Sequence, residues 1–214
     1  MATIKQTSVK ITQELGKLER ALKIKLKQFY NKNIKNSQKS LYQIRQDSGQ
    51  SLENEIRNTI QSSWLFSNQI IQDTIGSQVN ISTKDVQGIE KTTDTMVNSF
   101  WNTAFKLQNR ETEFKLNSNQ ELVQMQPLDL TAAMGAASAY FTYYAFNLGM
   151  MSKADELGFN IKLRFTVRSD CVDTKICRPL EGKLFDIGNV PYQPPLHKHC
   201  HCHLIPIIVP QNGQ

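Results

Sequence analysis

The sequence predicts an α+β fold, in which long N-terminal helices are followed by one further helix and a small antiparallel β-sheet that carries a Cys/His module. Two observations lead to this prediction. Apolar residues recur at every third or fourth position through most of residues 11–116, and they alternate with polar residues from residue 161 onward. All four cysteines and all four histidines lie between residues 171 and 203. We therefore expect a helical region at residues 1–126 and a C-terminal domain at residues 127–214.

The N-terminal segment is expected to form a basic amphipathic helix. Its apolar residues share one helical face, which most of the lysines avoid: Ile11, Leu15, Leu18, Leu22, Leu26 and Phe29. Residues 1–45 carry 11 basic and 2 acidic side chains, whereas residues 46–158 carry 7 basic and 13 acidic ones. The net charge of +6 therefore arises mainly at the N-terminus. Such a surface either contacts nucleic acid phosphates, docks on an acidic protein or remains a solvated helix face.

Two more long helices are expected at about residues 37–75 and 86–116, with a turn near residues 76–82 and a linker at residues 117–127. The chain then runs for 23 residues, 130–152, without a formal charge. This length is sufficient to span a membrane, but six alanines and several polar residues dilute its hydrophobicity. We therefore predict a helix buried inside the protein. The alternative is a membrane-associated protein that uses residues 130–152 as a span or as a transient membrane contact.

The change of apolar period near residue 160 predicts the sheet. Gly158 suits the end of the preceding helix, and residues 161–167 alternate between apolar and polar side chains, as in a half-buried strand. Residues 183–187 form a second short strand after a Glu-Gly turn. Residues 204–209 form a third strand, and Pro206 places it at an edge of the sheet because proline cannot donate a backbone hydrogen bond.

Potential metal ligands fall into two groups inside the Cys/His module, residues 165–208. The first group is Cys171 and Cys177, and the second includes His197, Cys200 and Cys202, with 19 residues between Cys177 and His197. Two donor groups bridged by a loop of this length are typical of a structural zinc site. A small sheet buries little core of its own, so a metal that ties its ends together contributes to folding. These five residues are therefore the candidate zinc ligands.

The choice among the donors stays open at this stage. If residues 197–203 are extended, the four histidines face one way and Cys200 and Cys202 the other, so four cysteines make the simplest ligand set. A set with His197 needs a turn, which the preceding Pro194-Pro195 favours. Alternatives to zinc are disulfides between the two groups, free buried thiols and a catalytic cysteine. Disulfides are disfavoured because no secretory leader is recognisable, and a catalytic cysteine lacks an orienting acid.

Three segments of this region also match a known pattern. Residues 177–185 fit Cys-x-x-Leu-x-Gly-Lys-x-Phe, and residues 197–202 fit His-x-x-Cys-x-Cys. Upstream, Asn147-Leu148-Gly149 lies in an alanine-rich helix. In these features the chain resembles the phage Mu F-like minor head proteins over about residues 131–208, whereas residues 1–125 match that family only in being helical. Thr174 stands where the family often has the first cysteine of a Cys-x-x-Cys pair, and Cys171 lies three residues earlier.

The resemblance implies a minor head protein, a capsid-associated structural protein of a tailed virus or provirus that acts in head morphogenesis at the portal and in DNA packaging or release. It implies the portal protein, capsid or scaffold proteins and packaged double-stranded DNA as partners. It also implies a place inside the virion near the portal, after assembly in the host cytoplasm. We expect neither an enzymatic activity nor a small-molecule substrate. A zinc-stabilised nucleic-acid-binding protein unrelated to capsids is the alternative.

Overall fold

The computed structural model describes residues 3–35, 37–110, 114–116, 122–124, 130–158, 161–169, 174–191, 193–197 and 200–209. Its long helices are α1 (Ile4–Phe29), α2 (Leu41–Ile75), α3 (Thr83–Arg110) and α4 (Leu130–Leu157), and a π-helical turn, Tyr30–Ile34, follows α1. Thr3 and Ser40 cap the N-termini of α1 and α2 with capping boxes. Each capping side chain accepts the backbone N–H of the glutamine three residues later, and the side chain of that glutamine accepts the backbone N–H of the capping residue. Gly76, with φ of 70°, ends α2 in the left-handed conformation that glycine adopts readily.

The predicted end of the third helix was wrong. We expected helix to about residue 116, but α3 ends at Arg110, and strands β1 (Phe114–Leu116) and β2 (Leu122–Gln124) follow as an antiparallel pair. Strand β2 also lies within the segment that we predicted to be a linker. Alternation over three residues is too short for apolar periodicity to distinguish a strand from the end of a helix. The predicted domain boundary at residues 126–127 lies outside the described residues.

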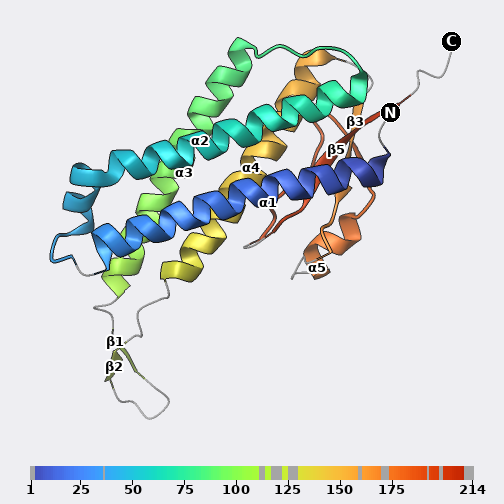
Figure 1. Cartoon of the computed structure of the whole chain (residues 1–214). Coiled ribbons are helices and arrows are strands. Elements are labelled where there is room, and N and C mark those ends of the chain that lie inside the picture. Colours follow the sequence, from blue (N-terminus) through green and yellow to red (C-terminus); the bar gives the residue numbers. More distant parts are fainter. Residues whose placement is uncertain are drawn as a thin grey trace.

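Helix α4 is the central element of the fold. It packs against α1, α2, α3 and the strand β5 (His203–Ile208), and Figure 1 shows it running behind α1 and α2. Tyr143, Phe146 and Asn147 on this helix are fully buried. The prediction of a buried helix is therefore confirmed over residues 133–152, most of which are buried. None of the described helices combines the length and the apolar character that crossing a membrane requires.

The C-terminal sheet has three antiparallel strands in the order β4-β3-β5. The central strand β3 (Ile161–Thr166) pairs with β4 (Leu184–Asp186) on one side and with β5 on the other, so that Leu163 lies opposite both Phe185 and Pro206. A short helix, α5 (Thr174–Cys177), and a 3-10 turn connect β3 to β4. The predicted half-buried strand and the edge position of Pro206 are both confirmed. Together with the long helices, the sheet confirms the α+β class.

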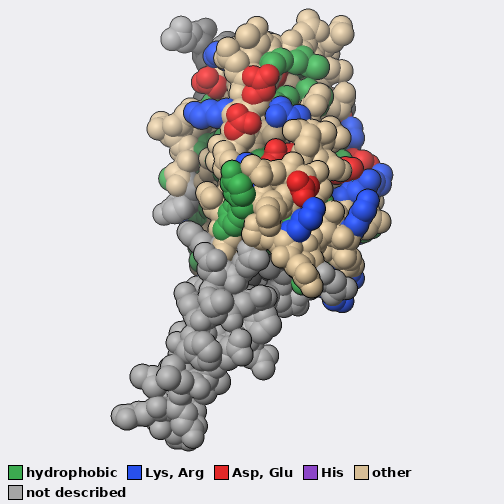
Figure 2. All heavy atoms as spheres, turned by 90° about the vertical axis from the view of Figure 1, so that its left-hand side faces the viewer, with side chains coloured by type: hydrophobic (Ala, Val, Ile, Leu, Met, Phe, Trp, Pro, Cys, Tyr) green, Lys and Arg blue, Asp and Glu red, His purple; other side chains and the backbone are tan. Residues whose placement is uncertain are grey.

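The core joins the sheet to the N-terminal helices. One buried cluster contains Ile11 and Leu15 of α1, Ile70 and Ile71 of α2, and the cysteines and strand residues of the Cys/His module. A second cluster fills the other end of the helical bundle around Trp101. Figure 2 shows the surface at that end of the bundle, where the chain passes from α1 to α2. Lys and Arg side chains are interspersed there with Asp and Glu side chains. The C-terminal module therefore shares its interior with α1 and α2.

A buried ion pair fixes the start of α3 against α4. Lys153 Nζ lies 2.6 Å from Asp85 Oδ2, and both side chains are almost completely excluded from solvent. Burial alone raises the pKa of Asp85, but hydrogen bonds from Lys153, the Ser82 backbone and the Trp64 indole outweigh it and lower the pKa. Trp64 also packs closely against Gly149 of α4, where an added Cβ would lie 2.9 Å from the ring. Helices α2, α3 and α4 therefore meet at closely fitted contacts.

Candidate metal centre

Three of the cysteines meet at the end of the sheet next to α4. Cys177 is the last residue of α5, while Cys200 and Cys202 lie just before β5. Their sulfur atoms all lie within 4.8 Å of one another, and the Cys177 and Cys200 Sγ atoms are 3.7 Å apart. Each of the three side chains is at most 1% exposed. Chain segments that are more than twenty residues apart thus present their thiols to one buried point.

His197 lies beside this cluster and contacts one of its members. Its Nε2 atom lies 3.1 Å from Cys177 Sγ. The backbone N–H of Cys200 donates to the carbonyl of His197 over 3.1 Å, and this contact turns the chain so that both residues face Cys177. The turn that a ligand set with His197 needs is therefore present. Of the five predicted ligands, the structure brings together Cys177, Cys200 and Cys202 and places His197 against Cys177, while Cys171 lies outside the described residues.

The position of Cys177 is set by the turn that follows it. Leu180 is buried beneath this turn, and Gly182 adopts a φ of 78°, which an L side chain rarely takes up. Strand β3 holds the turn from the other side, because the Gly182 N–H donates to the Phe165 carbonyl and the Phe165 N–H donates to the Lys183 carbonyl. The Leu-x-Gly-Lys part of the sequence pattern is therefore the part that anchors Cys177 against the core.

Asn147 of α4 holds the second donor group in place. Its Oδ1 accepts the Leu204 N–H over 2.8 Å, and its Nδ2 lies 3.3 Å from the carbonyls of both Pro194 and Cys202. These two carbonyls flank the segment that carries His197 and Cys200. In the sequence, Asn147 was notable only as part of the Asn-x-Gly segment of the family pattern. Local periodicity does not show that it lies beside residues some fifty positions away.

The electrostatics of the trio favour a cation. The S–H of Cys202 and nearby backbone N–H groups donate to the Cys200 sulfur, and they lower the pKa of Cys200 to about 5. The same hydrogen bond and burial raise the pKa of Cys202. The Cys200 thiolate is thus stable beside the Cys202 thiol, whereas three buried thiolates at this separation repel one another unless a cation neutralises them. The Cys177, Cys200 and Cys202 cluster can hold a metal ion such as zinc.

The two histidines nearest to β5 serve a different purpose. His201 Nε2 lies 3.3 Å from a carboxylate oxygen of Glu19, and its ring packs on Tyr143. His203 is fully buried with Nε2 3.3 Å from Ser8 Oγ, and burial lowers its pKa to about 4. Both contacts reach α1. These histidines therefore connect the Cys/His module to the N-terminal helix, a role that their sequence positions did not reveal.

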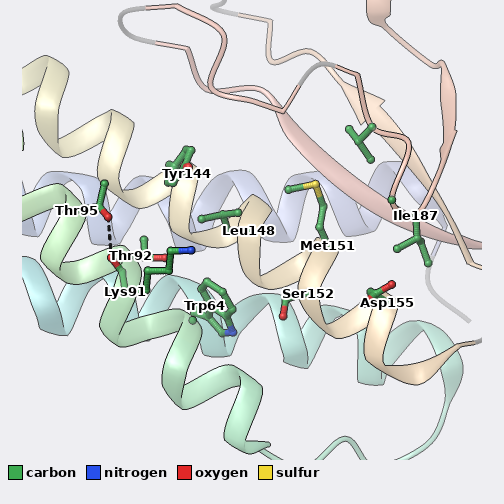
Figure 3. Close-up of a pocket in the computed structure, with 13 residues that line it drawn as sticks. Trp64, Lys91, Thr92, Thr95, Tyr144, Leu148, Met151, Ser152, Asp155 and Ile187 are labelled. Atoms are coloured by element: carbon green, nitrogen blue, oxygen red, sulfur yellow. Dashed lines mark hydrogen bonds between the residues drawn. The ribbon is translucent and has the colours of Figure 1, made fainter.

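A groove of about 500 Å³ is lined by Trp64, by residues of α3 and α4, and by the chain that follows β4 (Figure 3). Trp64 lies in it, and an added Cβ at Gly88 would come within 2.4 Å of the indole, so α3 approaches this ring closely. Most of the lining is apolar, with Lys91 and Asp155 as its charged residues. The lining contains neither a histidine nor a cysteine. The groove thus offers no metal donors of the kinds found in the thiol cluster.

Comparison with family models, with curated proteins and with solved structures found no match to this chain. The functional inference therefore depends on the residues of the Cys/His module and on how they are arranged.

Proposed function

We propose that this chain is a minor head protein, a capsid-associated structural protein of a tailed virus or provirus. It acts in head morphogenesis at the portal and has the portal protein and capsid or scaffold proteins as partners. It is assembled in the host cytoplasm and remains inside the virion near the portal. The proposal extends the sequence resemblance over residues 131–208, and it includes neither an enzymatic activity nor a small-molecule substrate.

One observation carries the proposal. The three segments that match the family pattern are distant in sequence, yet they contact one another directly. Asn147 of the Asn-x-Gly segment bonds the chain at Cys202 and Leu204, and Cys177 of the second segment meets Cys200 and His197 of the third. Matches that arose by chance have no reason to converge on one buried point. Their convergence supports a shared structural module.

Isolation of particles tests this function. Virions and procapsids are purified from an induced host, and the chain is measured in each by quantitative mass spectrometry together with the portal protein. We expect a fixed, low ratio to the major capsid protein and association with the portal after the capsid shell is dissociated. A host protein of similar abundance in the lysate controls for carry-over. Absence of the chain from both virions and procapsids would refute the proposal.

We infer further that the metal of the Cys/His module is a structural zinc ion held by Cys177, His197, Cys200 and Cys202. Thiolates with one imidazole form a closed, four-donor set that is typical of structural zinc and leaves no open position for a substrate. The complete burial of the three thiols supports a structural role, because a reactant cannot reach them. Zinc also provides the positive charge that three neighbouring thiolates require.

Zinc content and a pair of histidine variants test this site. We expect about one zinc ion per chain, and a loss of protection from hydrogen exchange in residues 165–208 when a chelator removes it. His197→Ala should weaken zinc binding at least about 10-fold, as is usual for the loss of a group that holds a metal site. His201→Ala removes a neighbouring histidine that contacts Glu19 instead, and it should keep the zinc. A pure protein that contains no zinc and is indifferent to added zinc would exclude the site.

A further inference from the structure

Helix α4 keeps one apolar face outside the core. Its buried face, which includes Phe146 and Met150, packs against the other helices and the sheet. Tyr144, Leu148 and Met151 follow one another at spacings of four and three on another side of this helix, and all three are only half-buried. Leu148 belongs to neither of the two buried clusters. These three residues line the groove of Figure 3, which we name the α3–α4 groove.

The apolar face extends beyond the groove toward the start of α4. Tyr140 lies one turn before Tyr144, stacks on its ring with the centroids 5.4 Å apart and is 37% exposed. From Tyr140 to Met151 the face covers three turns, or about 16 Å of helix. This face belongs to the uncharged segment at residues 130–152, which is apolar on every side although the core covers only part of it. Contiguous apolar surface of this kind marks an interaction site.

One cation and one anion flank the apolar part of the groove. Lys91 of α3 and Asp155 of α4 both line it and are both exposed, and Figure 3 shows them on either side of Trp64. Neither forms an ion pair with another described residue. The groove is therefore apolar at its centre and charged at its margin, as protein interfaces are. A complementary partner carries apolar residues flanked by one carboxylate and one cation.

We propose that the α3–α4 groove binds an amphipathic helix of another protein. Such a helix presents apolar residues at every third or fourth position, which matches the spacing of the α4 face, and this mode of recognition is common for hydrophobic grooves. Two walls of the groove are helices, whose backbone groups are bonded along their own axes, so an extended strand finds no backbone partners there. A symmetric dimer of this chain would place groove against groove, and two concave surfaces do not fill each other.

The inference goes beyond the proposed function, because that function names partners but no surface that binds them. It rests on the shape and charges of the groove and not on where the chain resides. The metal donors belong to α5 and to the chain before β5, whereas the groove has neither a cysteine nor a histidine in its lining. A chain that is found in virions but binds no helix in this groove would contradict only this inference.

Fluorescence anisotropy with labelled synthetic peptides and the full-length protein tests the groove. The peptides have about 18 residues, or about 27 Å of helix. Leucines occupy one face, alanines fill the rest, and one glutamate and one lysine flank the leucines at a separation that varies across the panel. A control peptide has the same composition in an order that spreads the leucines around the helix. We expect the best peptide of the panel to bind at least about 10-fold more tightly than this control.

Two leucine variants locate the binding. Leu148→Glu places a carboxylate at the centre of the groove and should weaken binding of the best peptide at least about 10-fold. Leu184→Glu is the matched control, because Leu184 is 51% exposed on β4 and does not line the groove. It should change the affinity by less than about 2-fold. Circular dichroism during heating verifies that both variants are folded.

Reversal of the two charges tests the complementarity at exposed positions, where the variants should fold normally. Lys91→Glu and Asp155→Lys should each weaken binding of the best peptide about 5-fold, because each places like charges together. The double variant should return to within about 2-fold of the original affinity, because the peptide can then bind in the opposite direction.

Three results would overturn the inference. The first is that no peptide of the panel binds more tightly than the control peptide. The second is an equal effect of the two leucine variants, or an additive loss in the double charge variant. The third is sedimentation of the full-length protein as a dimer that Leu148→Glu dissociates, which would assign the groove to a second copy of this chain.

Discussion

Replacement of Asn147 by leucine gives a direct test of how the Cys/His module is attached to α4. The two side chains have the same number of heavy atoms and the same branching at Cγ, so Asn147→Leu removes hydrogen bonds without opening a cavity. The asparagine is completely buried, and its Oδ1 accepts the Leu204 N–H over 2.8 Å. In the variant this N–H has no partner, because it faces away from β3 and water does not reach it.

The expected cost follows from the groups left without partners. A buried donor that loses its acceptor costs about 1–3 kcal/mol, and the Leu204 N–H is the strongest such case here. The carbonyls of Pro194 and Cys202 lose longer contacts of 3.3 Å, so we expect less from them. The extra apolar surface of leucine offsets about 1 kcal/mol. The contribution of the carbonyls and the offset from leucine roughly cancel, so we expect a net loss of about 1–3 kcal/mol in the free energy of unfolding.

Urea unfolding in saturating zinc measures this loss, and hydrogen exchange of the Leu204 amide locates it. Thr142→Val is the matched control, because Thr142 lies on the same helix, is equally buried and donates only to the Ser138 carbonyl one turn away. Its loss should stay below about 1 kcal/mol. We also expect about 10-fold weaker zinc binding for Asn147→Leu, because the ligand segment loses its support. Equal stability of the two variants, with an unchanged Leu204 amide, would refute this account of Asn147.

Two other substitutions test the packing of α4 and the buried histidine. Gly149→Ala should lower the free energy of unfolding in urea by about 2 kcal/mol, because the added Cβ would lie 2.4 Å from Ser67 Oγ. Gly135→Ala is the control: its Cβ would have no contact closer than 3.4 Å, so this variant should be neutral or stabilising. Equal effects of the two substitutions would contradict this packing. Burial lowers the pKa of His203 to about 4. As the pH falls below about 6.5, His203 therefore binds a proton in the unfolded chain but not in the folded one, and the free energy of unfolding decreases. The loss that depends on His203 should reach about 2 kcal/mol at about pH 5 and be absent from His203→Gln; the same pH dependence in both proteins would exclude this histidine as its source.

Much of the fold was accessible from local sequence. The apolar stripe of α1, the glycine at the end of α4 (Gly158) and the alternation in β3 are short-range patterns, and each predicted its element from residues close together in the chain. The edge position of β5 followed from Pro206 alone, since proline has no N–H to donate. The end of α3 and the β1–β2 pair were not predicted, because three alternating residues carry too weak a signal. The clustering of cysteines and histidines also indicated where a metal site should be sought.

The sequence by itself determined the α+β class, the four long helices, the three strands of the C-terminal sheet and the set of candidate donors. Only the tertiary structure decided what each histidine contacts. The sequence selected His197 as the candidate ligand, and the structure places it against Cys177. His201 and His203 instead reach Glu19 and Ser8 on α1. The reason is physical: periodicity depends on neighbours within a few residues, whereas a metal site depends on where distant segments are brought together. That convergence is set by α4, through contacts such as the bond from Leu204 to Asn147.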